Sequence, residues 1–182
     1  MMARMLRVGP AATAAFLLLG SPQNLAPFIP TPEDVVDRML SLASVTSADV
    51  VYDLGCGDGR IPIAAAKKHG AHGVGIDIDP KRIEESKANA KAAGVEHLVR
   101  FRVENALTAD VSPATVVTLY LLSSSNQALR PLLQRQLKPG ARIVSHAFSM
   151  GDWDAEKEDL FVDSGGTQRR LYLWIADGKV RQ

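Results

Sequence analysis

Cysteine is nearly absent from this sequence, since Cys56 is the only one among 182 residues. One cysteine cannot form an internal disulfide and cannot by itself build a cysteine-rich zinc site, so we expect no metal site. Stability must then come from packing. The 46% of apolar residues is enough for one domain with a core of its own, and the chain is too short for two full-sized catalytic domains.

An excess of charge of one sign is also missing. The 21 Lys and Arg residues are balanced by 20 Asp and Glu residues, which leaves a formal net charge of +1. General nucleic-acid-binding proteins carry a strongly basic surface, although a local basic patch remains compatible with this balance. We therefore expect no strong nucleic-acid signature.

The apolar run near the amino terminus is too short to cross a membrane. Residues 11–19 form a run of about ten apolar residues, whereas a spanning helix needs ~20. Arg4 and Arg7 precede this run and loop-like residues follow it, as in a secretory signal. Residues 1–30 are thus expected to form an arm that is either signal-like or anchoring, or loosely packed. The expected location is cytoplasmic or membrane-associated, with membrane proximity through this arm and export left open.

Residues 31–182 alternate between predicted helices and strands, without internal repeats. Thr31 is expected to cap the first helix with its hydroxyl, and Pro32 suits the first helical position. Later helices are predicted at 61–69, 80–91 and 126–137. Strands are predicted at 50–54, 73–78, 99–103, 115–122, 141–147, 160–162 and 170–175.

This alternation predicts an α/β fold with one Rossmann-like, doubly wound sheet that is mostly parallel. The two last strands are joined by a gap too short for a crossover helix, so they should form an antiparallel hairpin. Ligands of such sheets bind beyond the carboxyl ends of the strands. The loops after Leu54, Ile78, Val103 and Leu122 should therefore share one cleft.

A glycine-rich turn follows the first strand and reads DLGCGDGR over residues 53–60. Its glycines permit a tight turn and close approach of a ligand to the backbone. The spacing differs from the Gly-x-Gly-x-x-Gly of dinucleotide-binding proteins and lacks the Gly-Lys-Ser/Thr ending of a P-loop. This pattern argues against a nicotinamide or flavin cofactor and against a phosphate-cradling P-loop.

Two further loops supply groups that suit an adenosine ligand. Asp77 ends the second strand, 20 residues after Gly57, where a carboxylate can accept both ribose hydroxyls. Asn105 and Ala106 follow the third strand and should meet an adenine edge. The three loops together can hold an adenosine and present its 5′ substituent over the glycine turn.

From about residue 31 to 175 the chain resembles the class I S-adenosylmethionine-dependent methyltransferases. The resemblance is carried by VYDLGCGDGR at 51–60, GID at 75–77 and LKPG at 137–140. It implies S-adenosyl-L-methionine as cofactor. By this resemblance the cofactor-binding residues are Asp53, Gly55, Cys56, Gly57, Asp77, Ile78, Asn105 and Ala106. Many family members carry Asp where Asn105 stands.

A narrower resemblance is to the small methyltransferases that modify lysine on the c subunit of ATP synthase or on the adenine nucleotide carrier. The chain shares with them an apolar amino-terminal segment, a Pro-Thr stretch at 29–32 and the Asp-Gly-Arg turn at 58–60. It implies methyl transfer by direct displacement to an amine, with a protein lysine as a candidate acceptor. A small-molecule or RNA methyltransferase, and a non-catalytic adenosine-binding module, remain alternatives.

The acceptor side carries weaker signals. In this fold the loop containing Tyr120 faces the acceptor, so Tyr120 is the candidate catalytic residue, with a packed strand aromatic as the other interpretation. Thr31 is a candidate lid residue over the methyl donor. We interpret His146 as a buried histidine in preference to a catalytic base. Cys56 is interpreted as a packing residue and not a nucleophile. Residues 152–154 either line the acceptor site or form an acidic surface loop.

Overall fold

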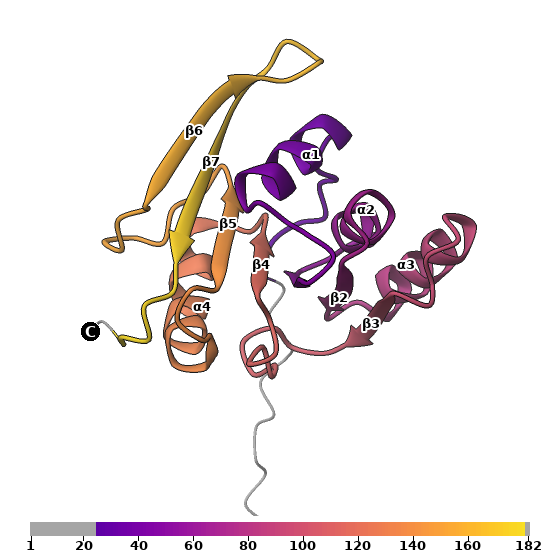
Figure 1. Ribbon diagram of the computed structural model, residues 1–182, viewed down its shortest axis with the longest axis horizontal. Helices are drawn as coiled ribbons and strands as arrows, with labels where there is room; N and C mark the ends of the chain where they lie inside the picture. Colours follow the sequence, from indigo (N-terminus) through magenta and orange to yellow (C-terminus); the bar gives the residue numbers. More distant parts are fainter. Residues whose placement is uncertain (1–24, 181–182) are drawn as a thin grey trace, which may run out of the picture.

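The structure is a computed structural model that describes residues 25–180 (Figure 1). Most of the predicted amino-terminal arm, residues 1–24, lies outside the described residues. The helices are α1 (Glu33–Leu42), α2 (Arg60–His69), α3 (Pro80–Ala92) and α4 (Ser123–Gln136). None of the helices within residues 25–180 is long and apolar enough to cross a membrane.

Seven strands form one sheet in the order β3-β2-β1-β4-β5-β7-β6. The strands are β1 (Val50–Leu54), β2 (His72–Asp77), β3 (Val99–Val103), β4 (Val116–Leu119), β5 (Arg142–His146), β6 (Lys157–Val162) and β7 (Gln168–Ile175). The first five are parallel, whereas β7 runs antiparallel to both β5 and β6. The predicted fold class, including the closing hairpin, is confirmed.

Both faces of the central strands are buried, because neighbouring residues of each strand enter different apolar clusters. In β1, Val51 packs with α1 and α2, while Tyr52 packs with α4 on the other face. Helix α3 lies beside α2 over β2 and β3, as Figure 1 shows. Helices on both faces leave the carboxyl edge of the parallel strands as the open place for a ligand.

The expected hydroxyl cap at Thr31 is wrong. Helix α1 begins at Glu33, no side chain caps it, and the first helical bond runs from the Val36 N–H to the Pro32 carbonyl. Thr31 therefore lies one residue too early to reach the helix donors. Its side chain is buried, and its carbonyl accepts a hydrogen bond from Arg60 Nη1 at 2.7 Å.

The fourth strand is shorter than predicted and the following helix is longer. Strand β4 ends at Leu119, and α4 already begins at Ser123, because the Leu122 carbonyl accepts the first helical bond from the Asn126 N–H at 3.0 Å. The apolar run of residues 115–122 concealed this change of backbone, since periodicity does not separate a buried strand from a buried loop. As a result, Tyr120 belongs to the connection between β4 and α4.

Candidate functional site

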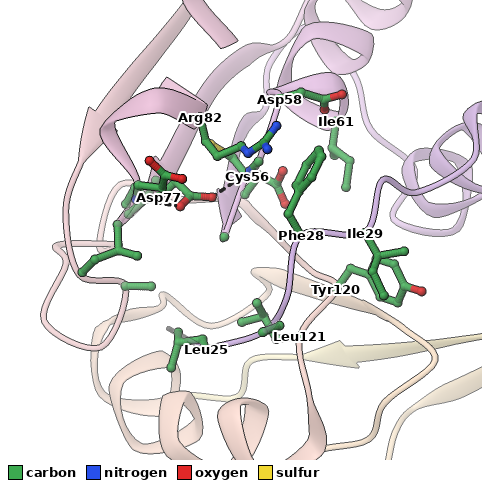
Figure 2. Close-up of a pocket in the computed structure, with 18 of the residues that line it drawn as sticks. Leu25, Phe28, Ile29, Cys56, Asp58, Ile61, Asp77, Arg82, Tyr120 and Leu121 are labelled. Carbon is green, nitrogen blue, oxygen red and sulfur yellow. Dashed lines mark hydrogen bonds between the residues drawn. The ribbon is translucent and has the colours of Figure 1, made fainter. Parts of the chain in front are cut away.

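A cavity opens at the carboxyl ends of the parallel strands (Figure 2). The predicted cleft is thus present, and all ten predicted site residues line it. They are Thr31, Asp53, Gly55, Cys56, Gly57, Asp77, Ile78, Asn105, Ala106 and Tyr120. The structure brings these residues together, while the role of each in binding stays a prediction.

The glycine turn is held in a conformation that side chains rarely adopt. Gly55, Gly57 and Gly59 have φ angles of +81°, +53° and +78°. The N–H groups of Gly55 and Cys56 both donate to the Ile76 carbonyl, at 2.8 and 3.0 Å. The turn is therefore fixed to β2, and it starts α2 at Arg60.

Asp77 is oriented by two backbone donors. Its Oδ2 accepts from the Gly57 N–H at 2.9 Å, and its Oδ1 accepts from the Asp79 N–H at 3.0 Å. Asp79 in turn caps α3 by accepting from the Lys81 N–H at 2.8 Å. Each Asp77 oxygen keeps a second acceptor position, so the carboxylate can still receive ligand hydroxyls.

Asp53 is the next-to-last residue of β1 and is only 3% exposed. Burial raises the pKa of its carboxyl to about 7, while the hydrogen bond donated by Thr118 Oγ1 at 2.8 Å lowers it and the Asp77 and Asp58 charges raise it further. A carboxyl with a pKa near neutrality can change its protonation when a charged ligand arrives. Asp53 is therefore a cavity carboxyl whose protonation can change on ligand binding.

Asn105 and Cys56 have their own local roles. Asn105 Oδ1 accepts from the Leu107 N–H at 3.0 Å, which folds the loop after β3. The Cys56 thiol is buried, and burial raises its pKa, with the Asp53 and Asp77 charges adding to the effect. A thiol that stays protonated is a poor nucleophile, in agreement with the predicted packing role.

Two other parts of the cavity wall lie outside the predicted site residues. Residues 25–30, which were assigned to the arm, line the cavity, and Ser125 Oγ donates to the Leu25 carbonyl. Phe28 extends from this segment toward Arg82, whose guanidinium lies 3.9 Å from the centre of the ring (Figure 2). The position of Arg82 in the first turn of α3, directly after the Asp79 cap, is a signal that could have placed it near Asp77.

The remaining acceptor candidates lie beside the cavity or away from it. His146 is 1% exposed, and burial lowers its pKa to about 4, with Arg169 lowering it and Asp163 raising it. It is neutral at physiological pH, which fits a buried histidine. In the 152–154 loop, Trp153 packs against Trp174, and none of the three residues lines the cavity described above.

Comparisons with known proteins agree with this geometry. Residues 53–157 match the ANTKMT methyltransferase domain family. A protein-lysine N-methyltransferase of Saccharolobus islandicus (strain REY15A) is 45% identical over 150 residues, which cover 82% of this chain and 92% of that protein. A lysine N-methyltransferase of Xenopus laevis, named for the c subunit of ATP synthase, is 31% identical over 127 residues, covering 70% of this chain and 55% of the relative.

A similar solved structure contains a product of methyl transfer. It is described as an RNA methyltransferase from Salinibacter ruber in complex with S-adenosyl-L-homocysteine. It superimposes with a TM-score of 0.78 and 52% identity, over 85% of this chain and 97% of that one. The similarity therefore extends over most of this chain and nearly all of the other.

Proposed function

The chain belongs to the ANTKMT methyltransferase domain family, and on this basis we propose that its methyl acceptor is the side-chain amine of a protein lysine. It is an S-adenosylmethionine-dependent methyltransferase, as the resemblance carried by the glycine turn and Asp77 implied. The observation that carries the lysine proposal is the 45% identity to a protein-lysine N-methyltransferase over 92% of that protein. Two proteins so similar along their length are expected to share the architecture of their acceptor sites.

The residues present fit the cofactor. A Cβ added at Gly57 would lie 2.4 Å from the Phe28 ring, and one added at Gly55 would lie 2.8 Å from Leu121 Cδ2, so the cavity wall is packed too tightly there for a side chain at either glycine. Gly55 and Gly57 would support the methionine part, and Asp77 would hold the ribose. Asn105 and Ala106 would face the adenine. When bound, S-adenosylmethionine supplies a methyl group on a positively charged sulfur.

Methyl transfer is a direct displacement, so this chain mainly has to orient a neutral amine and exclude water. Apolar side chains from the 25–30 segment and from Leu121 line the cavity and limit access of water. Asp53 holds a proton near neutrality or gives it up beside a cationic ligand. His146 adds no positive charge near Tyr120, because burial keeps its imidazole neutral.

Transfer of radiolabelled methyl groups into a fractionated cell extract tests the proposal. We expect label that resists ribonuclease, is removed by protease and is recovered as methyllysine. Asp77→Ala serves as the control that lacks the expected ribose contact. Label that ribonuclease removes would overturn the lysine proposal in favour of an RNA acceptor, the second candidate, which the 52% identity to the Salinibacter ruber protein favours.

We also propose that the enzyme works where its methyl donor is made, in the cytoplasm, with residues 1–30 holding it close to a membrane. The apolar run at 11–19 supports this proposal, because it is shorter than the ~20 residues of a spanning helix. Mass spectrometry of the mature amino terminus tests it. An amino terminus processed after the apolar run would contradict the anchoring role.

A further inference from the structure

The turn after β5 has a strained backbone. Ala147 has a φ of +68°, a region that a residue with a side chain seldom adopts. The Phe148 N–H donates to the His146 carbonyl at 2.9 Å, which closes a γ-turn around Ala147. Strain of this kind persists only where the surroundings hold it, and it gathers at functional sites.

The surroundings hold this turn from two sides. Asn126, fully buried in the first turn of α4, donates through Nδ2 to the Phe148 carbonyl and to Ser145 Oγ, both at 3.0 Å. Ser145 Oγ donates to the same Phe148 carbonyl at 2.7 Å. From β7, the Arg170 carbonyl accepts from the Ala147 N–H at 2.8 Å. The γ-turn is therefore a fixed part of the fold.

The turn places two rings against Tyr120. The His146 ring lies 4.0 Å from the Tyr120 ring between centroids, at an interplanar angle of 30°. The Phe148 ring lies 6.5 Å from it at 26°. Tyr120 itself lines the cofactor cavity, and Figure 2 shows it on the opposite side from Asp77. A residue that lines the cavity is thus backed by two rings, one from the end of β5 and one from the γ-turn that follows it.

His146 contributes its ring and not a hydrogen bond to this arrangement. Its Nδ1 is buried and has no hydrogen-bond partner within residues 25–180. If the His146 ring only filled space, an aliphatic side chain could replace it at little cost. A stacked ring also restricts the rotation of the Tyr120 ring, which an aliphatic side chain does not do. Burial also lowers its pKa to about 4, so no charge on the ring competes with a cation beside Tyr120.

We propose that Tyr120, His146 and Phe148 form the aromatic wall of the acceptor subsite, with His146 as the positioning residue that fixes the Tyr120 ring beside the incoming lysine amine. This inference rests on the proposed function. Lysine arrives as an alkylammonium ion, which the face of an aromatic ring attracts. The ion gives its proton to water before the neutral amine attacks, and the methylated product is again a cation that the ring can hold. The wall therefore favours an aliphatic amine, which is cationic when it arrives, over an uncharged hydroxyl or amide group.

Binding of n-butylammonium, which mimics the end of a lysine side chain, tests the wall without requiring turnover. The protein is saturated with S-adenosylhomocysteine and labelled in its three tyrosines, and Tyr120→Phe assigns the Tyr120 NMR signal. We expect n-butylammonium to shift this signal in the wild type and in His146→Phe, which keeps a ring. In His146→Leu we expect at least fivefold weaker binding.

Tyr172→Leu is the matched control. Tyr172 also stacks on a ring, that of Trp174 at 5.6 Å and 27°, but it lies on β7 and does not line the cavity. We expect Tyr172→Leu to leave n-butylammonium binding unchanged. All variants should bind S-adenosylhomocysteine within twofold of the wild type by calorimetry. If His146→Leu does not fold, Phe148→Leu removes the other ring and carries the same expectation.

Two results of the binding measurements would overturn the inference. One is n-butylammonium binding to His146→Leu as tight as to the wild type. The other is a parallel loss of S-adenosylhomocysteine affinity, which indicates a merely structural role. If the wild type labels only RNA in the extract and n-butylammonium leaves Tyr120 unshifted, the lysine proposal fails together with the wall. If the wild type methylates protein lysine while His146→Leu keeps its KM for that protein, the wall alone fails.

Discussion

Asp77 and Gly57 are joined by a hydrogen bond of 2.9 Å from the Gly57 N–H to the Asp77 carboxylate. The bond links the end of β2 to a turn 20 residues earlier in the chain. It means that the group expected to bind the ribose also sets the position of the glycine expected to lie under the methionine part. A change at either residue should disturb both parts of the cofactor site.

Asp77→Asn should weaken binding of S-adenosylhomocysteine by about 10- to 100-fold, or about 1.4–2.8 kcal/mol. The amide keeps one acceptor oxygen, but its NH2 group then faces one of the two backbone donors at Gly57 and Asp79. Calorimetry measures the affinity. Asp110→Asn is the matched control, because Asp110 also accepts from a backbone N–H two residues later, at 3.0 Å, away from the cavity. Equal losses in both variants would contradict the prediction.

Gly57→Ala should reduce both stability and cofactor binding. At a φ of +53° an added Cβ costs about 1–2 kcal/mol, and it would also lie 2.4 Å from the Phe28 ring. Gly94→Ala separates the two effects, since Gly94 has a φ of +71° but no atom within 4 Å of the added Cβ. Thermal unfolding should show a loss for both variants. Affinity for S-adenosylhomocysteine should fall only for Gly57→Ala, and an unchanged affinity there would count against the cavity as the cofactor site.

Binding of S-adenosylmethionine should release a proton near pH 7. The pKa of Asp53 is about 7 in the free protein, and a cationic ligand beside it favours the ionised carboxylate. Affinity should therefore rise as the pH rises, by about tenfold from pH 6 to pH 8 if the carboxyl is fully ionised in the complex. Calorimetry in two buffers of different ionisation enthalpy measures the released proton. Asp53→Asn should abolish the buffer dependence, and its persistence would assign the proton to another group.

The free energy of unfolding should depend on pH through His146. Its folded pKa of about 4 lies below its ordinary value of 6.5, so the unfolded state takes up the proton first. The contribution of the neutral, buried imidazole to the free energy of unfolding is fully present above about pH 6.5. It is lost as the pH falls toward 4, by at most about 3 kcal/mol. Denaturant unfolding of the wild type and His146→Phe between pH 4 and 7.5 measures the difference.

Asp53 acts in the opposite direction over nearly the same range. Its folded pKa of about 7 lies above its ordinary value of 3.8, so Asp53 makes the folded state less stable as the pH rises from about 4 to 7. The two groups therefore partly cancel in the wild type, and the difference from His146→Phe is the informative quantity. A difference that does not change with pH would show that the imidazole titrates normally in the folded protein.

The chain order of the strands and helices and the glycine turn could be predicted because each signal is local. The turn at 53–60 and the Asp79 cap of α3 are short stretches whose backbone preference needs no distant partner. The rule that parallel strands carry ligands at their carboxyl ends then placed Asp53, Asp77 and Asn105 around one cavity. The sequence by itself thus determined the fold class, and its resemblance to the class I methyltransferases implied the methyltransferase activity.

Packing between distant segments decided the rest. No local pattern links Tyr120 to His146, which is 26 residues away, and the rings meet only because β4 and β5 pair and Asn126 holds the γ-turn at Ala147. The segment 25–30 lines the cavity and contacts α4, and nothing in the sequence of the segment predicts that contact. Local backbone preferences are set by neighbouring residues. A contact between separate segments depends instead on how the whole sheet brings those segments together.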